Sequence, residues 1–166
     1  MAEGLFRHHI RSAGLSDFSV SSAGLLEGGR AASAQAIAVL GDRGIDLSTH
    51  LSRTVDQTII GQADLALCME RQHLRAAAVL GVGAFGKTFT VKEFVRLGLD
   101  AAPRGREEPF TAWLARIGTK RDPQKLLSPD AADEVADPVG GTRRQFEDTA
   151  EELDLLMRGV KLLLSG

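Results

Sequence analysis

The sequence lacks the features that disulfides, membrane spans and nucleic-acid contacts require. It has one cysteine, which excludes an internal disulfide and is typical of a reducing compartment. No apolar run approaches the roughly 20 residues that span a bilayer, and the N-terminus lacks a charged-then-apolar signal pattern. A net charge of -2 supplies no basic excess for binding nucleic-acid phosphates. These absences predict a cytoplasmic protein that binds neither membranes nor nucleic acid.

The residues that are present have the composition of a folded globular protein. Hydrophobic residues make up 43% and charged residues 25% of the 166 positions, a balance that argues against a disordered chain. A chain of this length is long enough to bury a substantial core in one domain. We therefore predict a single domain over residues 1–166, without internal repeats or low-complexity tracts.

Segments with the period of a helix alternate with segments typical of strands along most of the chain. Strands are predicted at residues 18–22, 65–69 and 87–90. Helices are predicted at residues 1–10, 30–42, 55–60, 70–80, 110–117 and 142–164. A further helix is predicted to follow the strand at residues 87–90 and to end at residue 97. This order predicts an α/β protein, with a parallel sheet and helices on both of its faces. Residues 100–133 are rich in proline, glycine and charge, and we interpret them as a surface insertion in the same domain.

Asp137 is the first candidate for a chemical role. It precedes Pro138, which disfavours helical backbone at Asp137, and Gly140 and Gly141 allow a sharp turn before the final helix. A carboxylate held on a rigid turn over a packed helix suits a general acid. The alternative is that Asp137 only shapes the turn, since this is a common role of aspartate before proline.

Cys68 and the segment from Gly81 to Thr88 offer two further interpretations. Cys68 lies in an unbroken apolar strand without an arginine at a catalytic spacing, so we interpret it as a buried structural thiol. Gly81, Gly86, Lys87 and Thr88 satisfy the literal spacing of a phosphate-binding loop. The segment follows a predicted helix and enters a strand, whereas such a loop runs from a strand into a helix. A nucleotide-binding protein that uses Gly81–Thr88 is therefore a competing but less favoured interpretation.

Several short motifs follow one another in an order that resembles a known family. They are Met1-Ala2-Glu3-Gly4-Leu5-Phe6-Arg7, Ser21-Ser22-Ala23-Gly24, Gly44-Ile45-Asp46 with His50 and Arg53, Ala63-Asp64-Leu65-Ala66-Leu67-Cys68-Met69, and Asp137-Pro138 before the final helix. Each motif is weak alone, but the ordered set resembles the low-molecular-weight protein tyrosine phosphatase family, which also includes related arsenate reductases. The resemblance covers nearly the whole chain except residues 100–133.

The resemblance implies a fold and a set of residue roles. The fold would be flavodoxin-like, with a four-stranded parallel sheet in the order 2-1-3-4. Asp137 would be the general acid that protonates the leaving oxygen, and Ser22 and His50 would support the catalytic loop by hydrogen bonding. The substrate would be a phosphotyrosine protein or a small phosphomonoester. No cofactor and no metal ion are implied.

The nucleophile of the family has no counterpart in this sequence. In the family a cysteine thiolate attacks phosphorus, and an arginine separated from it by five residues binds the phosphoryl oxygens. The loop that carries both, and the central first strand before it, would precede Met1. The resemblance therefore implies an N-terminally truncated chain that is inactive by itself.

Two departures from the family leave alternatives open. Val139 and Gly140 stand where many members of the family carry aromatic residues, and the sequence has no tyrosine. We therefore expect weaker binding of aryl substrates. A non-catalytic binding module on the same fold is the alternative to an enzyme.

Without the first strand, residues 18–22 and 65–69 would each have an unpaired edge facing a gap of about 10 Å, which predicts self-association.

Overall fold

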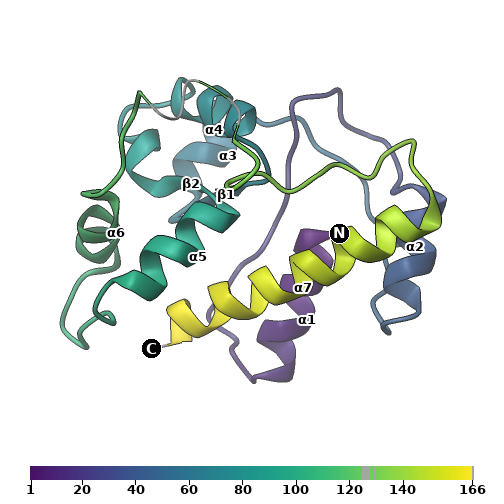
Figure 1. Cartoon of the computed structure of the whole chain (residues 1–166), viewed down its shortest axis with the longest axis horizontal. Helices are drawn as coiled ribbons and strands as arrows, with labels where there is room; N and C mark the ends of the chain where they lie inside the picture. Colours follow the sequence, from purple (N-terminus) through teal and green to yellow (C-terminus); the bar gives the residue numbers. More distant parts are fainter. Residues whose placement is uncertain (125–127, 129, 166) are drawn as a thin grey trace. The chain divides into compact units, whose positions relative to one another are not determined.

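The computed structural model describes residues 1–124, 128 and 130–165, and the chain divides into two compact units (Figure 1). Unit 1 comprises Met1–Thr54 and Val135–Leu162. Unit 2 comprises Val55–Glu134 and the residues from Leu163 onward.

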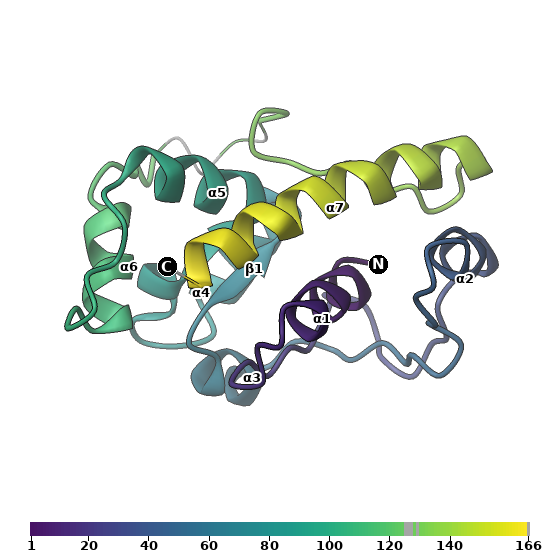
Figure 2. The same ribbon diagram turned by 90° about the horizontal axis from the view of Figure 1, so that it is seen from below.

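Helix α1 (Ala2–Ser12) opens unit 1, close to the helix predicted at residues 1–10. Its first turn carries Glu3 and its last turn Arg11, charges that complement the helix dipole. One face of α1 is buried, through Gly4, Leu5, Phe6 and Ile10. His9 Nε2 lies 2.8 Å from Asp154 Oδ1 of the final helix, and Figure 2 shows the two helices close to each other at this level. The apolar face and this polar contact hold α1 in the core of unit 1.

The final helix, α7 (Arg143–Ser165), confirms the long helix predicted at residues 142–164. It begins with a capping box, in which Thr142 Oγ1 accepts from the Gln145 amide and Gln145 Oε1 accepts from the Thr142 amide. One face of the helix is buried along most of its length and contributes to the core of unit 1. The buried residues are Phe146, Thr149, Ala150, Leu153, Met157 and Val160. The helix is therefore fixed both at its start and along one face.

Helix α2 (Ala34–Gly41) is shorter than the helix predicted at residues 30–42. The side chain of Ser33 caps it by accepting a hydrogen bond from the Ala36 amide, which moves its start four residues along the chain. The residues before Ser33 pair with a later loop instead, through isolated bridges between Ala31 and Leu51 and between Gly24 and Thr54.

The strand predicted at residues 18–22 is wrong, because these residues are not in a strand. A strand requires a neighbouring main chain to complete its ladder of hydrogen bonds. Here two of the segment's carbonyls accept from side chains: Val20 O from Arg7, and Ser22 O from Arg53. Alternating side chains alone did not distinguish an extended segment from a paired strand.

Unit 2 contains a two-stranded parallel sheet. Strands β1 (Ala66–Cys68) and β2 (Thr88–Thr90) pair with Leu67 opposite Phe89 and Cys68 opposite Thr90. Both strands lie inside segments predicted as strands. In Figure 1 they lie between helices α4 (Arg71–Ala78) and α5 (Val91–Asp100), and both helices contact the sheet.

Two short helical segments and one longer helix complete unit 2. They are α3 (Gln57–Gln62), the 3-10 turn η1 (Ala84–Lys87) and α6 (Phe110–Gly118). Helix α6 agrees with the helix predicted at residues 110–117. It buries Trp113, Leu114 and Ile117, and the Trp113 ring meets Phe94 edge to face at 5.9 Å. Part of the predicted surface insertion therefore belongs to the core of unit 2.

The order of helices and parallel strands confirms the predicted α/β fold class. Within the described residues, the paired strands form one sheet of two strands, rather than the four that the family resemblance implies. In the same part of the chain, no helix is both long and apolar enough to cross a membrane.

Candidate functional site

A cluster of polar side chains in unit 1 forms around Glu3, on the first turn of α1. We call Glu3, Arg7, Ser22 and His50 the Glu3 cluster. Ser22 Oγ donates a short hydrogen bond to Glu3 Oε2, and Arg7 Nη2 lies 2.9 Å from Glu3 Oε1. His50 Nδ1 lies 3.8 Å from Glu3 Oε2, near enough to attract the carboxylate when the imidazole is protonated. Glu3 thus brings together Ser22 and His50, the two residues to which the family resemblance gives one supporting role.

Two arginines without a role in the sequence prediction, Arg7 of the Glu3 cluster and Arg53, bind the backbone around Ser22. Arg7 Nε donates to Val20 O at 3.0 Å, and Arg53 donates to Ser22 O from Nε at 3.2 Å and Nη2 at 3.1 Å. The backbone on both sides of Ser21 is therefore fixed by charge-assisted hydrogen bonds. Glu3 and Arg7 could have been found from their i, i+4 spacing on a predicted helix, whereas no local signal pairs Arg53 with Ser22.

A pocket of about 590 Å³ adjoins the Glu3 cluster within unit 1. Its volume is within the range of ligand sites, roughly 300–1,000 Å³. It is lined by one face of α1 and by the loop from Gly44 to Leu51, and the ionisable residues in its wall are Glu3, Arg7, His8, Arg11, Asp46 and His50. The hydrogen bonds that Asp46 accepts from Ser48 lower the pKa of this carboxyl. The wall carries charges of both signs.

Gly4 allows the loop from Ile45 to Leu47 to approach α1 beside this pocket. A Cβ atom at Gly4 would lie 2.9 Å from Leu47 Cδ2 and 3.1 Å from Ile45 Cγ2, both of which belong to buried side chains. The small residue is therefore needed for close packing at this point.

Asp137 lies on an exposed turn just before α7. Its Oδ1 accepts from the Val139 amide at 3.0 Å, and the Gly141 amide donates to Pro138 O at 2.8 Å. Gly140 has a φ of 82°, which favours glycine. The side chain therefore makes the Asx turn that the structural alternative requires, and it leaves Oδ2 without a hydrogen bond among the described residues. In that part of the chain Asp137 makes no hydrogen bond or ion pair with Ser22, His50 or Glu3.

Cys68, at the end of β1, is not arranged as a nucleophile. Burial raises the pKa of its thiol to about 12, and Arg121 only partly offsets this effect. The thiolate that attacks phosphorus in cysteine phosphatases would be almost absent at neutral pH.

The residues from Gly81 to Thr88 do not form a phosphate-binding loop. They lie between α4 and β2, the reverse of the strand-to-helix order that such a loop needs. Lys87 Nζ donates to the carbonyls of Gly61 at 3.1 Å and Ala63 at 2.5 Å. Thr88 Oγ1 is buried and donates to Ala84 O at 2.7 Å. Both side chains that would hold phosphate and Mg²⁺ are therefore used to join structural elements.

Within residues 1–124, 128 and 130–165, no three histidine, cysteine, aspartate or glutamate side chains gather as a metal site.

These features define an α/β protein with a Glu–Ser–His cluster at the start of its first helix and an Asp-Pro turn before its last. The family model described as "Low molecular weight phosphotyrosine protein phosphatase" matches residues 1–119. The chain therefore belongs to this family, and the resemblance inferred from the ordered motifs is confirmed.

Solved structures of the same family share the fold. A low molecular weight protein tyrosine phosphatase from T. tengcongensis is 27% identical, with a TM-score of 0.70, 96% of this chain covered and 86% of that chain covered. The solution structure of such a phosphatase from Bacillus subtilis is 26% identical, with a TM-score of 0.71 and coverage of 99% and 87%. A mutant of the YwlE arginine phosphatase that carries a phosphorylated active-site serine is 25% identical, with a TM-score of 0.72 and coverage of 99% and 86%. A search of curated proteins finds no match.

Proposed function

We propose that this chain is the scaffold of a phosphomonoester hydrolase that acts on a phosphotyrosine protein or a small phosphomonoester. The observation that carries the proposal is the Glu3 cluster, which joins Ser22 and His50 at the start of α1. In the family resemblance the catalytic loop directly precedes this helix. Ser22 and His50 would then support that loop by hydrogen bonding, in a role that needs no direct contact with substrate.

Asp137 is proposed as the general acid. Its turn is closed by two hydrogen bonds, its carboxylate is exposed, and Oδ2 accepts no hydrogen bond from the described residues, so this oxygen can carry a proton to a leaving oxygen. The Asx turn and the general acid are compatible, because they use different oxygens of the same carboxylate.

Residues 1–166 are proposed to be inactive on their own. Cys68 is the only cysteine, and burial raises the pKa of its thiol to about 12. The chain supplies an acid, which contributes about 10²–10⁴-fold, but neither a low-pKa thiolate nor an arginine loop that binds the phosphoryl group. The codons upstream of Met1 would tell whether such a loop belongs to the natural protein.

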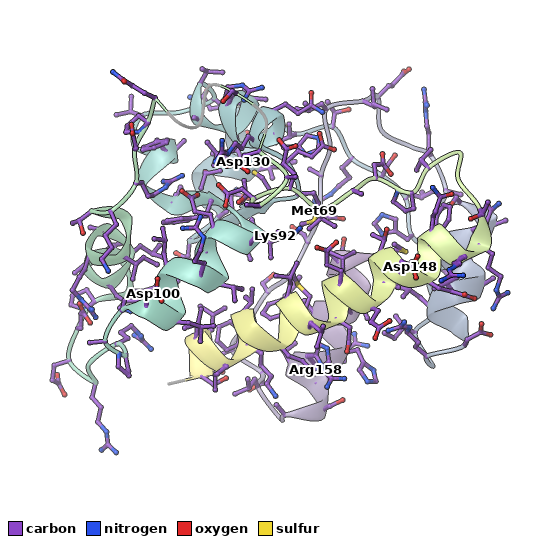
Figure 3. The ribbon with its side chains drawn as sticks, viewed as in Figure 1. Met69, Lys92, Asp100, Asp130, Asp148 and Arg158 are labelled. Carbon is purple, nitrogen blue, oxygen red and sulfur yellow. The ribbon has the colours of Figure 1, made fainter. Side chains whose placement is uncertain are left out.

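The experiment compares turnover of para-nitrophenyl phosphate by residues 1–166 and by a chain extended with a Cys-to-Arg loop. We expect no turnover by the first, with or without Cys68→Ser, and turnover by the second. Asp137→Ala should lower the rate of the extended chain about 10²–10⁴-fold, most of all for esters with poor leaving groups. Asp148→Ala is the matched control, since Asp148 is an exposed aspartate of α7 (Figure 3). Turnover by residues 1–166 that Cys68→Ser abolishes would refute the proposal.

Phosphoarginine is a second candidate substrate. Val139 and Gly140 follow Asp137-Pro138, so the turn carries no aromatic ring to pack against a phosphotyrosine, and one structure of 25% identity is described as an arginine phosphatase. A guanidine is a basic leaving group, so its departure also needs a proton from an acid such as Asp137. A higher kcat/KM of the extended chain for phosphoarginine than for phosphotyrosine would favour this substrate.

We also propose a domain organisation, a location and self-association for this protein. One domain over residues 1–166, with residues 100–133 as an insertion, is supported by a family match that includes parts of both units. A cytoplasmic location is supported by the single cysteine. Self-association is supported by two features of the described part of the chain: residues 18–22 pair with no strand there, and β1 has β2 as its one partner strand. A molar mass from light scattering that stays at the monomer value at all protein concentrations would exclude self-association.

A non-catalytic binding module is the alternative to the enzyme. It would keep the Glu3 cluster and the Asp137 turn but would show no turnover even in the extended chain. Nucleotide binding at Gly81–Thr88 is disfavoured, because Lys87 and Thr88 already have structural partners.

A further inference from the structure

Arg71 is a buried arginine with no role in the proposed chemistry. It is the first residue of α4, three positions after the end of β1, and its exposed fraction is 6%. Arginine is almost never buried to this degree unless its charge is paired. The groups that pair with the Arg71 side chain therefore indicate its structural role.

Arg71 binds four residues that lie close together in the sequence, namely Ser128, Asp130, Asp133 and Glu134. Its Nη2 donates to Asp133 Oδ2 at 2.7 Å and to Asp130 Oδ2 at 3.0 Å, and Nη1 donates to Ser128 O at 3.0 Å. Its own amide donates to Glu134 Oε1 at 3.3 Å. Figure 3 shows Asp130 beside α4. We call Arg71, Ser128, Asp130, Asp133 and Glu134 the Arg71 cluster.

Asp133 is held from a second helix as well. Arg96 of α5 donates from Nη2 to Asp133 Oδ1 at 2.7 Å, so each carboxylate oxygen has an arginine. Burial opposes ionisation of Asp133, but the hydrogen bonds from Arg71 and Arg96 outweigh it and lower the pKa of this carboxyl. The segment is therefore fixed to two helices by charge-assisted bonds, which are stronger than neutral ones.

The Arg71 cluster ends where the chain leaves unit 2. Glu134 is the last residue of that unit before the chain enters unit 1, and Val135 and Ala136 are all that separate it from Asp137. A chain extends at most about 3.6 Å per residue, so the backbone of Asp137 lies within roughly 14 Å of the backbone of Asp133. Val135 is 3% exposed, which restricts this short connection further.

The Asp137 turn is fixed on its other side by the Val139 amide and by the buried stripe of α7. We propose that Arg71 is a positioning residue for Asp137, because it holds the chain immediately before the turn that presents this carboxylate. The inference rests on the proposed function only in giving Asp137 a catalytic task; the restriction of the turn is independent of it. A residue that merely stabilised unit 2 would have no specific effect on residues 135–141.

Amide hydrogen exchange on residues 1–166 tests the restriction directly. Arg71→Met should raise exchange in the peptide covering residues 135–141 by about tenfold or more, while the α6 peptide stays near its wild-type rate. Arg116→Met is the matched control, because Arg116 pairs with Glu108 elsewhere in unit 2, with both carboxylate oxygens at 2.9 Å. This variant should leave residues 135–141 unchanged.

Arg71→Lys provides a second variant if Arg71→Met does not fold. Lysine keeps the positive charge but lacks the planar guanidinium group that binds Ser128, Asp130 and Asp133 at once. Arg71→Lys should therefore raise exchange at residues 135–141, but by less than Arg71→Met does. Unchanged exchange at these residues in a folded Arg71 variant would overturn the proposal. A uniform rise across unit 2 would overturn it as well, because that result means a stabilising role alone.

In the extended chain the same inference has a catalytic readout. Arg71→Lys should reduce turnover of phenyl phosphate more than that of para-nitrophenyl phosphate, since the poorer leaving group depends more on the acid. Combining it with Asp137→Ala should cost no more than Asp137→Ala alone. An inactive extended chain would refute the proposed function while the exchange result still decides the role of Arg71.

Discussion

Replacement of Arg121 by methionine should strongly destabilise unit 2, because Arg121 is deeply buried with its charge fully engaged. Its side chain is 3% exposed and that of its partner Glu93 is 5% exposed. Arg121 donates to Glu93 Oε1 at 2.9 Å, and to Phe85 O and Thr88 O at 2.9 Å each. The guanidinium also lies 4.2 Å from the centre of the Phe85 ring and 4.3 Å from that of Phe89.

The cost follows from what the substitution leaves behind. Methionine retains much of the apolar packing of the arginine stem, but Glu93 would be left in the core without its cation. Breaking a buried ion pair by removing one partner costs about 3–5 kcal/mol, and loss of the contacts with two aromatic rings adds roughly 0.5–2 kcal/mol. Because a domain is stable by only about 5–15 kcal/mol, Arg121→Met should bring unit 2 close to unfolding at 25 °C.

Urea denaturation followed by tryptophan fluorescence measures this effect. Trp113 is the only tryptophan, the chain has no tyrosine, and Trp113 is buried in unit 2. Arg143→Met is the control, since this arginine is 57% exposed in unit 1 and its loss should leave the fluorescence transition in place. Arg121→Met combined with Glu93→Met should recover much of the stability. A free energy of unfolding within about 1 kcal/mol of wild type for Arg121→Met alone would refute the reasoning.

Two further changes test other parts of the structure. Gly4→Ala should destabilise unit 1 by about 1–3 kcal/mol in urea unfolding followed by circular dichroism, since its Cβ would lie 2.9 Å from Leu47 Cδ2; Gly41→Ala, where a Cβ meets no atom within 4 Å, should not destabilise, and equal losses would contradict this packing argument. The lowered pKa of Asp133 means that its contribution is complete above its unfolded value of about 3.9 and is lost as pH falls through its folded value. The difference in urea midpoint between wild type and Asp133→Asn should therefore be constant from about pH 7 to pH 5 and shrink below about pH 4, and a difference that already shrinks at about pH 6 would exclude Asp133 as its source.

Local sequence signals placed most of the helices correctly. Helix α1 and helix α7 each have an apolar stripe with a helical period, and that stripe is what the fold buries. Side-chain caps such as Ser33 and Thr90 set where α2 and α5 begin. These properties depend on residues a few positions apart and are therefore local, but the cap at Ser33 was not recognised, and α2 was predicted to begin four residues too early.

The order of several weak motifs carried information that no single motif did. It predicted the phosphatase family, which the match over residues 1–119 confirms, and the alternation of helices and strands predicted the α/β class. The half-buried strand Ala66–Cys68 and the buried strand Thr88–Thr90 were also recognisable, because short runs that are apolar or rich in β-branched and aromatic residues are typical of strands.

Tertiary structure decided the features that depend on partners far along the chain. Residues 18–22 have a strand-like pattern, but a strand exists only when another main chain pairs with it, and here Arg7 and Arg53 bind two of the carbonyls. Glu3 meets Ser22 and His50 only because α1 and two separate loops converge.

The same physical reason applies to the buried arginines. Arg71 and Asp133 are 62 residues apart, and Arg121 and Glu93 are 28 apart. By itself, the sequence determined which residues are apolar, charged or able to cap a helix, and therefore where helices form and which faces are buried. Which charges lose their water and must find a partner was decided by the packing of these elements against one another, since the cost of desolvation exists only in the folded core.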